Sequence, residues 1–412
     1  MSAVYFEANY DRRIDPNTHL ILSLILIIAT AGLSLSFRER DLGDTSLDLQ
    51  NGLKLVFWFG SLGFSLLHIK TIISALRSPS GIALSILTLL ALASATWSEK
   101  PLYTLACAIG FAAYLGVAAL CLHKLTEAEF YKIMQSLLLA FVGLGLIGAL
   151  IFPDLTWQPP SVEETQFRLQ GFAANSNNFG RMAALLTLIG LGTFFRNRTM
   201  TLSICLSISV GLVSLILSGS RTGLVAAVLA VGVLGFRLFR YRLIVFLSAL
   251  TALSITLIFI SYGFSFDTLF KSLSRTGLEG EIFTLTGRTD LWTAAWELIA
   301  ERPFFGWGFN GTEERLSTMM GADFYGAPVN PHQMFLHLAL GLGLVGVVPA
   351  LFFISDRLIK FIRKPDLLND LLFLFILING MAEVDLFGTP LFTNIIFFRI
   401  IMKNNVSSGP MR

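Results

Sequence analysis

The chain is poor in charge. Asp, Glu, Lys and Arg make up only 14% of its 412 residues, whereas an average soluble domain carries roughly 25%. Such a chain cannot cover a water-exposed surface with charged groups, so the composition excludes an ordinary soluble enzyme and a disordered polypeptide. The apolar share of 54% and the mean hydropathy of +0.70 instead indicate a protein embedded in a membrane.

Cysteine is scarce as well, and its three residues lie in or beside apolar stretches without metal-ligand spacing. Neither a disulfide framework nor a zinc site is therefore expected. No nucleotide-binding loop is expected, because no glycine run that could cradle a phosphate precedes a lysine. No nucleic-acid partner is expected either. No cleavable signal peptide is expected, because the charged residues at 11–15 lead straight into a long apolar run. We expect the first span to act as the targeting signal.

Long, continuous apolar runs are what the sequence does contain. They are too long and too uniform for the alternating strands of a membrane barrel. Since a span consumes about 20 apolar residues, the sequence predicts an all-α polytopic membrane protein with about 12 transmembrane helices. We expect residues 1–412 to form a single integral membrane domain. The predicted spans are 20–36, 53–69, 80–97, 102–122, 133–152, 177–195, 201–217, 222–238, 243–263, 333–354, 367–381 and 384–402.

The distribution of basic residues predicts the orientation. When the N-terminus is placed in the cytoplasm, the short loops rich in Lys and Arg all fall on the cytoplasmic side, as does the C-terminus. The opposite, periplasmic side then receives the acidic loops at 153–176 and 264–331. The loop 264–331 is long enough to carry structure of its own.

Within the long periplasmic loop, apolar residues recur at helical spacing between Arg288 and Pro303. Leu291, Trp292 and Trp296 belong to this apolar stripe, and charged residues occupy the other face. The pattern predicts an amphipathic helix that lies at the membrane surface.

Four arginines are predicted on the outer side of the membrane: Arg168, Arg181, Arg221 and Arg288. An ionisable group at mid-span costs roughly 2.5–3.5 kcal/mol, so each needs a partner or a wet cavity, unless it snorkels to the interface. Arg221 lies in a Ser-Gly-Ser-Arg-Thr-Gly turn and Arg288 follows a glycine at a helix start, settings that suit an anion. Two guanidiniums from distant segments fit a pyrophosphate better than a carboxylate.

His332 stands behind Pro331, where the long loop meets a span. An imidazole titrates in the range that suits a general base near neutral pH, although a residue that merely starts a helix remains an equal alternative. His337, on another face, is expected to be a packed helix residue. If His332 is not the base, the base is to be sought among Glu279, Glu281, Asp290 and Glu383.

Several stretches together resemble the O-antigen ligase and polymerase family of bacterial membrane glycosyltransferases. His332-Gln333 is followed by Gly343-Leu344-Val345-Gly346, which fits the family's ligase pattern. Residues 287–308 are similar to its arginine helix and the following loop, and 218–223 to its buried arginine turn. Residues 171–180, with their asparagines, look like the helix start before that turn. The resemblance covers about residues 165–355.

The resemblance implies a metal-independent, inverting membrane glycosyltransferase that needs no cofactor and has a GT-C-like fold. Its donor would be a glycan on undecaprenyl pyrophosphate, used at the periplasmic face of the bacterial inner membrane. By the match of motifs, His332 would take the proton of the acceptor hydroxyl, and Arg221 and Arg288 would hold the pyrophosphate. Further substrate contacts would come from Arg168, Asn175, Asn178, Arg181 and Gln333.

Three functions stay open on the sequence. A polymerase would add the growing glycan to the next lipid-linked repeat unit, and a ligase would move it to a lipid A-core acceptor. A small-anion transporter would perform no chemistry, but such folds commonly show two related halves and helices broken at mid-membrane, and neither feature is apparent in the sequence. The His-Gln and Gly-x-x-Gly pattern favours a ligase, whereas the turn at 97–101 resembles exopolysaccharide polymerases. The polymerase is the preferred interpretation.

The predicted topology can be tested with reporter fusions. A phosphatase that folds only in the periplasm should be active when fused after Gly311, whereas a fluorescent protein that folds only in the cytoplasm should stay dark there. Activity of the cytoplasmic reporter alone at this position would contradict both the topology and the outward-facing site.

Overall fold

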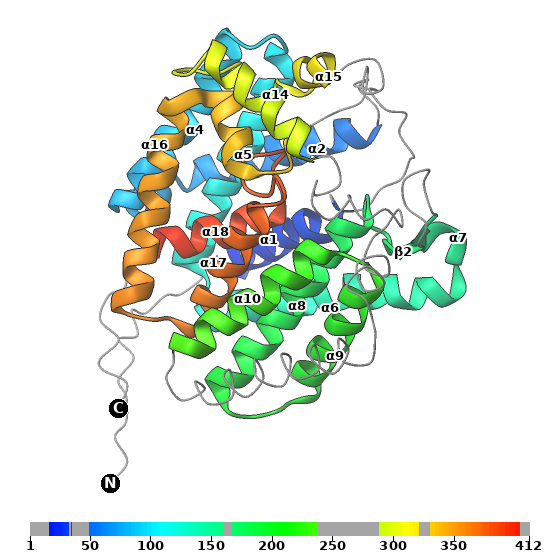
Figure 1. The fold of residues 1–412 in the computed structure, drawn as a ribbon. Helices are drawn as coiled ribbons and strands as arrows, with labels where there is room; N and C mark the ends of the chain where they lie inside the picture. Colours follow the sequence, from blue (N-terminus) through cyan, green and yellow to red (C-terminus); the bar gives the residue numbers. More distant parts are fainter. Residues whose placement is uncertain are drawn as a thin grey trace.

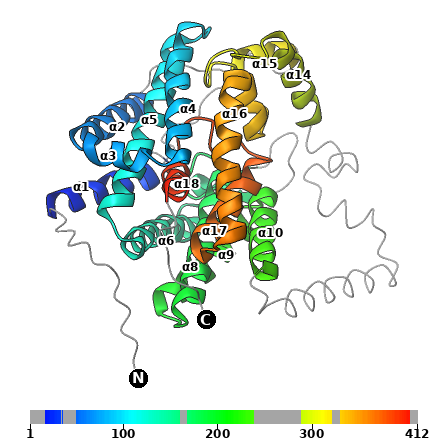
Figure 2. The same ribbon diagram turned by 90° about the vertical axis from the view of Figure 1, so that its left-hand side faces the viewer.

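The computed structural model describes residues 16–32, 34, 49–159, 167–237, 288–320 and 330–403. Nearly all regular structure in these ranges is α-helical, which confirms the predicted all-α class (Figures 1 and 2). The predicted span at 243–263, the acids Glu279 and Glu281 and most of the loop 264–331 lie outside the described residues.

The N-terminal part of the chain folds into consecutive apolar helices. Proline at the first helical position and an oxygen-bearing cap start several of them. Ser78, for example, accepts a hydrogen bond from the backbone of Gly81, and Thr126 forms a capping box with Glu129. The elements are α1 (Pro16–Ile27) with the π-turn η1 (Ile28–Gly32), α2 (Leu49–Leu67), α3 (Ile69–Leu76), α4 (Pro79–Ala93) with the 3₁₀-turn η2 (Ser94–Thr96), α5 (Pro101–Lys124) and α6 (Glu127–Ile151).

A short two-stranded ribbon interrupts the helices, and its strands pair antiparallel. The remaining elements are α7 (Pro153–Thr156), β1 (Trp157–Gln158), β2 (Arg168–Leu169), α8 (Ser176–Asn197), α9 (Leu202–Leu217), α10 (Arg221–Arg237), α14 (Arg288–Glu301), α15 (Glu313–Met320), α16 (Met334–Arg363), α17 (Leu367–Gly380) and α18 (Phe392–Met402).

Two tightly packed regions organise the bundle. In one, α5 lies among α2, α4 and α18, and in the other α8 lies against α6, α9, α10 and α17. Small residues allow the close approaches: a Cβ added at Gly110 of α5 would lie 2.7 Å from the ring of Trp58, and one at Gly211 of α9 would lie 2.3 Å from Thr187 Oγ1. Such small-residue contacts replace the hydrophobic driving force that is absent between helices in lipid.

Among the described residues, five helices are long and apolar enough to cross a membrane: Pro79–Thr96, Pro101–Lys124, Glu127–Ile151, Ser176–Asn197 and Met334–Arg363. A sixth span results if α2 and α3, which meet at a bend of 87°, count as one. The other predicted spans in the described ranges form shorter apolar helices. The helices therefore indicate a multi-pass membrane protein, while the number twelve stays a prediction.

The predicted span at 384–402 is wrong in its first half. Helix α18 begins only at Phe392, and residues 381–391 form a non-helical stretch. Pro390 follows Gly388 and Thr389, and proline disfavours helical backbone at the residue before it. This non-helical stretch contains Glu383 and Asp385.

Helix α14 forms where the amphipathic pattern predicts it. Leu291, Ala294, Ala295 and Leu298 are buried, whereas Trp296 is 60% exposed. The buried face packs on α16 and α15 (Figure 2). The exposed indole of Trp296 is the part of the apolar stripe that would face the membrane surface.

Helix α16 is broken at Gly343, whose φ of 60° lies in the left-handed region. The break leaves carbonyls and N–H groups without helical partners, and the loop 303–308 supplies them. Trp307 and Gly308 donate to the carbonyls of Leu340 and Gly341 at 3.0 and 2.8 Å. In return, the N–H groups at 344 and 345 donate to the carbonyls at 303 and 304 at 2.9 and 3.2 Å.

This backbone clamp corrects the expected role of the Gly-x-x-Gly pattern. Glycines with this spacing in a membrane helix are expected to let a neighbouring helix pack closely. Instead, a Cβ at Gly343 would lie 2.3 Å from the carbonyl oxygen of Phe304, so Gly343 admits the loop 303–308. A Cβ at Gly346 would meet Leu342 of the same helix at 2.4 Å.

A cluster of paired charges lies where the C-terminal part of α16 meets α17. Arg357 and Asp370, which are 1% and 0% exposed, form an ion pair there. Close by, the ammonium of Lys403 contacts the carboxylates of Asp366, at 2.6 Å, and Glu127. These pairs tie α6, α16, α17 and the end of α18 together.

The clamp predicts a strong effect of Gly343→Ala. An L-residue in the left-handed region costs roughly 1–2 kcal/mol, and the clash with Phe304 adds to that cost. The thermal midpoint of the purified protein in detergent should therefore fall by several degrees. Gly143→Ala is the matched control, since no atom lies within 4 Å of its added Cβ and alanine favours the helix. An unchanged midpoint for Gly343→Ala would contradict the clamp.

Candidate functional site

His332 has an unusual backbone conformation just before α16. Its φ is 45°, and its N–H donates to Asn330 Oδ1 at 3.0 Å. The indole N–H of Trp292 in α14 donates to the carbonyl of Pro331 at 2.8 Å, which ties the preceding residue to that helix. Non-glycine residues with positive φ persist only where the surroundings hold them, and they cluster at functional sites.

The imidazole of His332 lies against the carboxylate of Glu383. Nδ1 of His332 is 3.4 Å from Oε2 of Glu383, and the side chains are 37% and 16% exposed. A carboxylate beside Nδ1 favours the tautomer that carries its proton there. The other nitrogen, Nε2, then keeps the lone pair that a general base requires.

A chain of hydrogen bonds extends from Glu383 into the protein. Asn177 of α8 donates from Nδ2 to Oε1 of Glu383 at 3.2 Å, and Arg168 of β2 donates to the amide oxygen of Asn177. Arg168, only 6% exposed, also donates from Nε to the carbonyl of Ser218 at 3.0 Å. We call Arg168, Asn177, Glu383 and His332 the relay network. It joins three parts of the chain that are far apart in the sequence, at residues 168–177, 332 and 383.

The turn at 218–220 brings Arg221 to this network. Gly219 has a φ of 59°, and a Cβ there would lie 3.2 Å from Nε of Arg168. Gly180 of α8 allows the turn to sit close, because a Cβ at Gly180 would lie 2.4 Å from Ser220. Arg221, half-buried, is the first residue of α10 directly after this turn.

Arg288 begins α14, one helical turn before Trp292. Since Trp292 is bonded to the residue before His332, the N-terminal end of α14 lies beside the relay network. The helix dipole directs its positive end there, which favours an anion. The side chain of Arg288 lies outside the described residues.

The other predicted substrate contacts have partners within the protein. The side chain of Asn175 caps α8 by accepting from the N–H of Asn178 at 2.8 Å, and Gln333 caps α16 by accepting from the N–H of Leu336. Arg181 donates to Asn178 Oδ1 and pairs with Asp385. These contacts cap α8 and α16 and join α8 to the non-helical stretch 381–391.

The ion pair of Arg181 and Asp385 fixes the non-helical stretch 381–391. Both residues are buried, at 7% and 0% exposure, and Asn379 also donates to Asp385. The pair joins this stretch to α8, and thereby sets where Glu383 stands. His337, as expected, is packed inside: its Nε2 lies 2.7 Å from Asn310 Oδ1.

The sequence singled out His332 and the arginines as candidate site residues, but it did not indicate the contacts that Asn177, Glu383 and Asp385 make. Glu383 was only an alternative base, and Asn177 and Asp385 carried no assigned role. An acidic residue inside an apolar run is a signal, and both Glu383 and Asp385 lie in one. Among the described residues, no group of three or more His, Cys, Asp and Glu side chains could hold a metal ion.

Residues 205–351 match the family model of the O-antigen ligase. No curated protein matches the chain significantly. The family match confirms the resemblance seen in the sequence and indicates a role in surface-polysaccharide biosynthesis. It includes Arg221, Arg288 and His332, whereas Arg168 and Glu383 lie outside the matched range.

The buried pair of Arg181 and Asp385 predicts a large effect on folding. Asp385→Ala leaves the guanidinium without its partner, a change that typically costs roughly 3–5 kcal/mol. The yield of monodisperse protein should therefore fall sharply on size-exclusion chromatography. Combining Asp385→Leu with Arg181→Met removes both charges and should restore part of that yield. A double variant no better than Asp385→Ala would contradict the pairing.

Proposed function

We propose that the protein transfers a glycan from undecaprenyl pyrophosphate to a hydroxyl group of an acceptor sugar. The reaction would take place at the periplasmic face of the bacterial inner membrane, with both chain termini in the cytoplasm. We further propose that the helices form a GT-C-like arrangement. The observation that carries the proposal is the contact between Nδ1 of His332 and the carboxylate of Glu383.

In the proposed reaction, Nε2 of His332 accepts the proton of the acceptor hydroxyl. The oxygen then attacks the anomeric carbon of the donor, and the bond from that carbon to the pyrophosphate oxygen breaks. Entry opposite the leaving group inverts the configuration. Glu383 stabilises the imidazolium that forms, as the carboxylate of a catalytic triad does. The step needs neither a metal ion nor a redox cofactor.

The leaving group determines what the arginines contribute. Pyrophosphate departs with its charge already formed, so fixed guanidiniums and a helix N-terminus can stabilise it in the transition state. Arg221 follows the turn that contacts Arg168, and Arg288 starts the helix tied to Pro331. Both approach the relay network from different sides, which suits a clamp on a two-phosphate group.

We prefer a polymerase, which would join repeat units while they remain on their lipid carriers. The alternative within the same chemistry is an O-antigen ligase with a lipid A-core acceptor. Deletion of the gene followed by a lipopolysaccharide gel distinguishes them. Core bearing a single repeat unit indicates a polymerase, and bare core with polymer retained on the carrier indicates a ligase. Unaltered polysaccharide together with lost uptake of an anion would indicate a transporter instead.

The first prediction for this mechanism concerns the base. Loss of a general base typically lowers the rate about 10²–10⁴-fold, so His332→Ala should abolish transfer while the protein remains folded. Glu383→Gln should also lower the rate, because an amide that donates to Nδ1 holds the proton on Nε2 instead. Polymer formed per amount of folded protein measures both effects.

The control for Glu383→Gln is Glu297→Gln, an exposed position on α14 whose activity should stay normal. If His332→Ala keeps more than about a tenth of the wild-type rate, it is no general base. The base would then have to be sought among Glu279, Glu281, Asp290 and Glu383.

The second prediction separates a phosphate clamp from simple membrane anchors. Lysine keeps the charge of arginine but loses its planar fork, so Arg221→Lys and Arg288→Lys should each remove most of the activity. Arg363→Lys, at the exposed end of α16, should have no effect. Polysaccharide made in a deletion strain, normalised to protein in the membrane, measures the outcome. Near-normal polymer from either site variant would assign that arginine to anchoring.

A further inference from the structure

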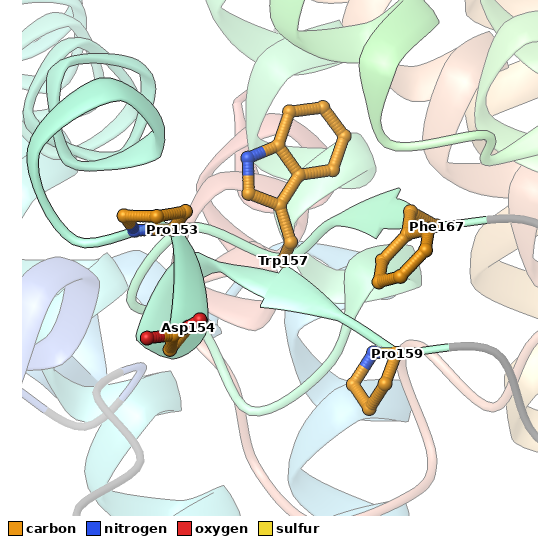
Figure 3. Close-up of a pocket in the computed structure, with 5 residues that line it drawn as sticks. All are labelled: Pro153, Asp154, Trp157, Pro159 and Phe167. Atoms are coloured by element: carbon orange, nitrogen blue, oxygen red, sulfur yellow. The ribbon is translucent and has the colours of Figure 1, made fainter.

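An aromatic hollow lies beside the relay network and takes no part in the mechanism above. Its volume is about 450 Å³. Figure 3 shows the indole of Trp157 standing up from its strand, with Pro153 and Phe167 on its two sides and Asp154 on the short helix α7. Pro159 completes the lining. Asp154 and Phe167 are exposed, and Trp157 is half-buried.

The hollow and the relay network occupy opposite faces of the same ribbon. Trp157 pairs with Leu169, and Gln158 pairs with Arg168. Because successive side chains of a strand point to opposite faces, Trp157 and Arg168 face away from each other. Gln158, on the face of Arg168, accepts from the hydroxyl of Ser176 at 2.9 Å, next to Asn177 of the network. A ligand in the hollow would thus lie across the ribbon from Arg168, the first residue of the relay network.

We propose that this hollow binds a sugar ring of the glycan, remote from the bond that is made; the proposal rests on the glycosyl transfer proposed above. A pyranose presents C–H groups on its faces and hydroxyls around its edge. The ring face of Trp157 removes those C–H groups from water. The carboxylate of Asp154 accepts hydrogen bonds from the hydroxyls. The volume lies in the range of about 300–1,000 Å³ that ligand pockets occupy.

The chemistry of the hollow argues for a neutral sugar over a lipid phosphate. Among the described residues that line it, the one charged group is the carboxylate of Asp154, which repels a phosphate or an anionic headgroup. The pyrophosphate instead fits the arginines on the other face of the ribbon. Exposed apolar residues do surround the hollow, among them Leu150 at 86% and Leu155 at 66%. The alternative that the experiment must exclude is therefore that this ribbon only anchors the protein to the membrane.

The first arm of the test measures binding without catalysis. The protein is reconstituted in lipid nanodiscs as the His332→Ala variant, and the free repeat-unit oligosaccharide of the host polysaccharide, which has no lipid or phosphate, is titrated by calorimetry. Trp157→Ala and Asp154→Asn should each weaken binding about tenfold, which corresponds to roughly 1.4 kcal/mol. Trp157→Phe should keep most of it. Trp296→Ala, at a tryptophan that is 60% exposed on α14, should change nothing.

The second arm measures transfer with an active site that is intact. In this arm Trp157→Ala should raise KM for the sugar substrate about tenfold and leave kcat largely unchanged, because a remote subsite contributes equally before and during the reaction. The same substitution should leave the share of protein recovered in the membrane fraction as it is.

The outcomes separate the subsite from the proposed function. Normal oligosaccharide binding and normal KM in Trp157→Ala, with an active wild type, would overturn the subsite and leave the transferase standing. A loss of membrane recovery without a change in binding would make the hairpin an anchor and overturn the subsite as well. A wild type that binds the oligosaccharide through Trp157 but transfers no glycan would support the subsite and overturn the transferase.

Discussion

The carboxylate of Glu383 is the contact on which the site depends, because it is where the described segments of the site meet. One carboxylate oxygen of Glu383 lies against the imidazole of His332, and the other accepts a hydrogen bond from Asn177. The side-chain oxygen of Asn177 in turn accepts a hydrogen bond from Arg168. In an apolar bundle an isolated charge is costly, so each of these groups needs the others. The need for partners thereby fixes the geometry of the histidine.

Non-helical backbone makes this arrangement feasible. At membrane depth such backbone is tolerated only where protein or an aqueous cavity surrounds it. The stretch 381–391 meets this condition because Arg181 and Asn379 hold Asp385 inside the bundle. The break at Gly343 meets it because the loop 303–308 takes up the backbone groups that the helix leaves unpaired. Both non-helical segments lie at the N-terminal part of α16, directly after His332.

The helical class and most helix positions could be predicted because long apolar runs leave few alternatives. Charged residues in costly places likewise led to Arg221 and His332. The partners of these residues could not be predicted, since spacing along the chain does not reveal that Asn177 and Glu383, 206 positions apart, share a hydrogen bond. The span at 384–402 failed because hydropathy averages over Pro390 and Asp385.

The backbone clamp at Gly343 has a consequence for how this protein can diversify. All four of its hydrogen bonds join main-chain atoms, so they do not depend on the side chains of Phe304 and Phe305. Phe304 and Phe305 are 62% and 57% exposed, and together with Trp97 and Arg302 they line a second hollow of about 510 Å³. Mutation can therefore remodel the outer surface of this loop while its frame stays in register with α16. A scaffold built this way lets selection explore new recognition chemistry at little risk to the fold.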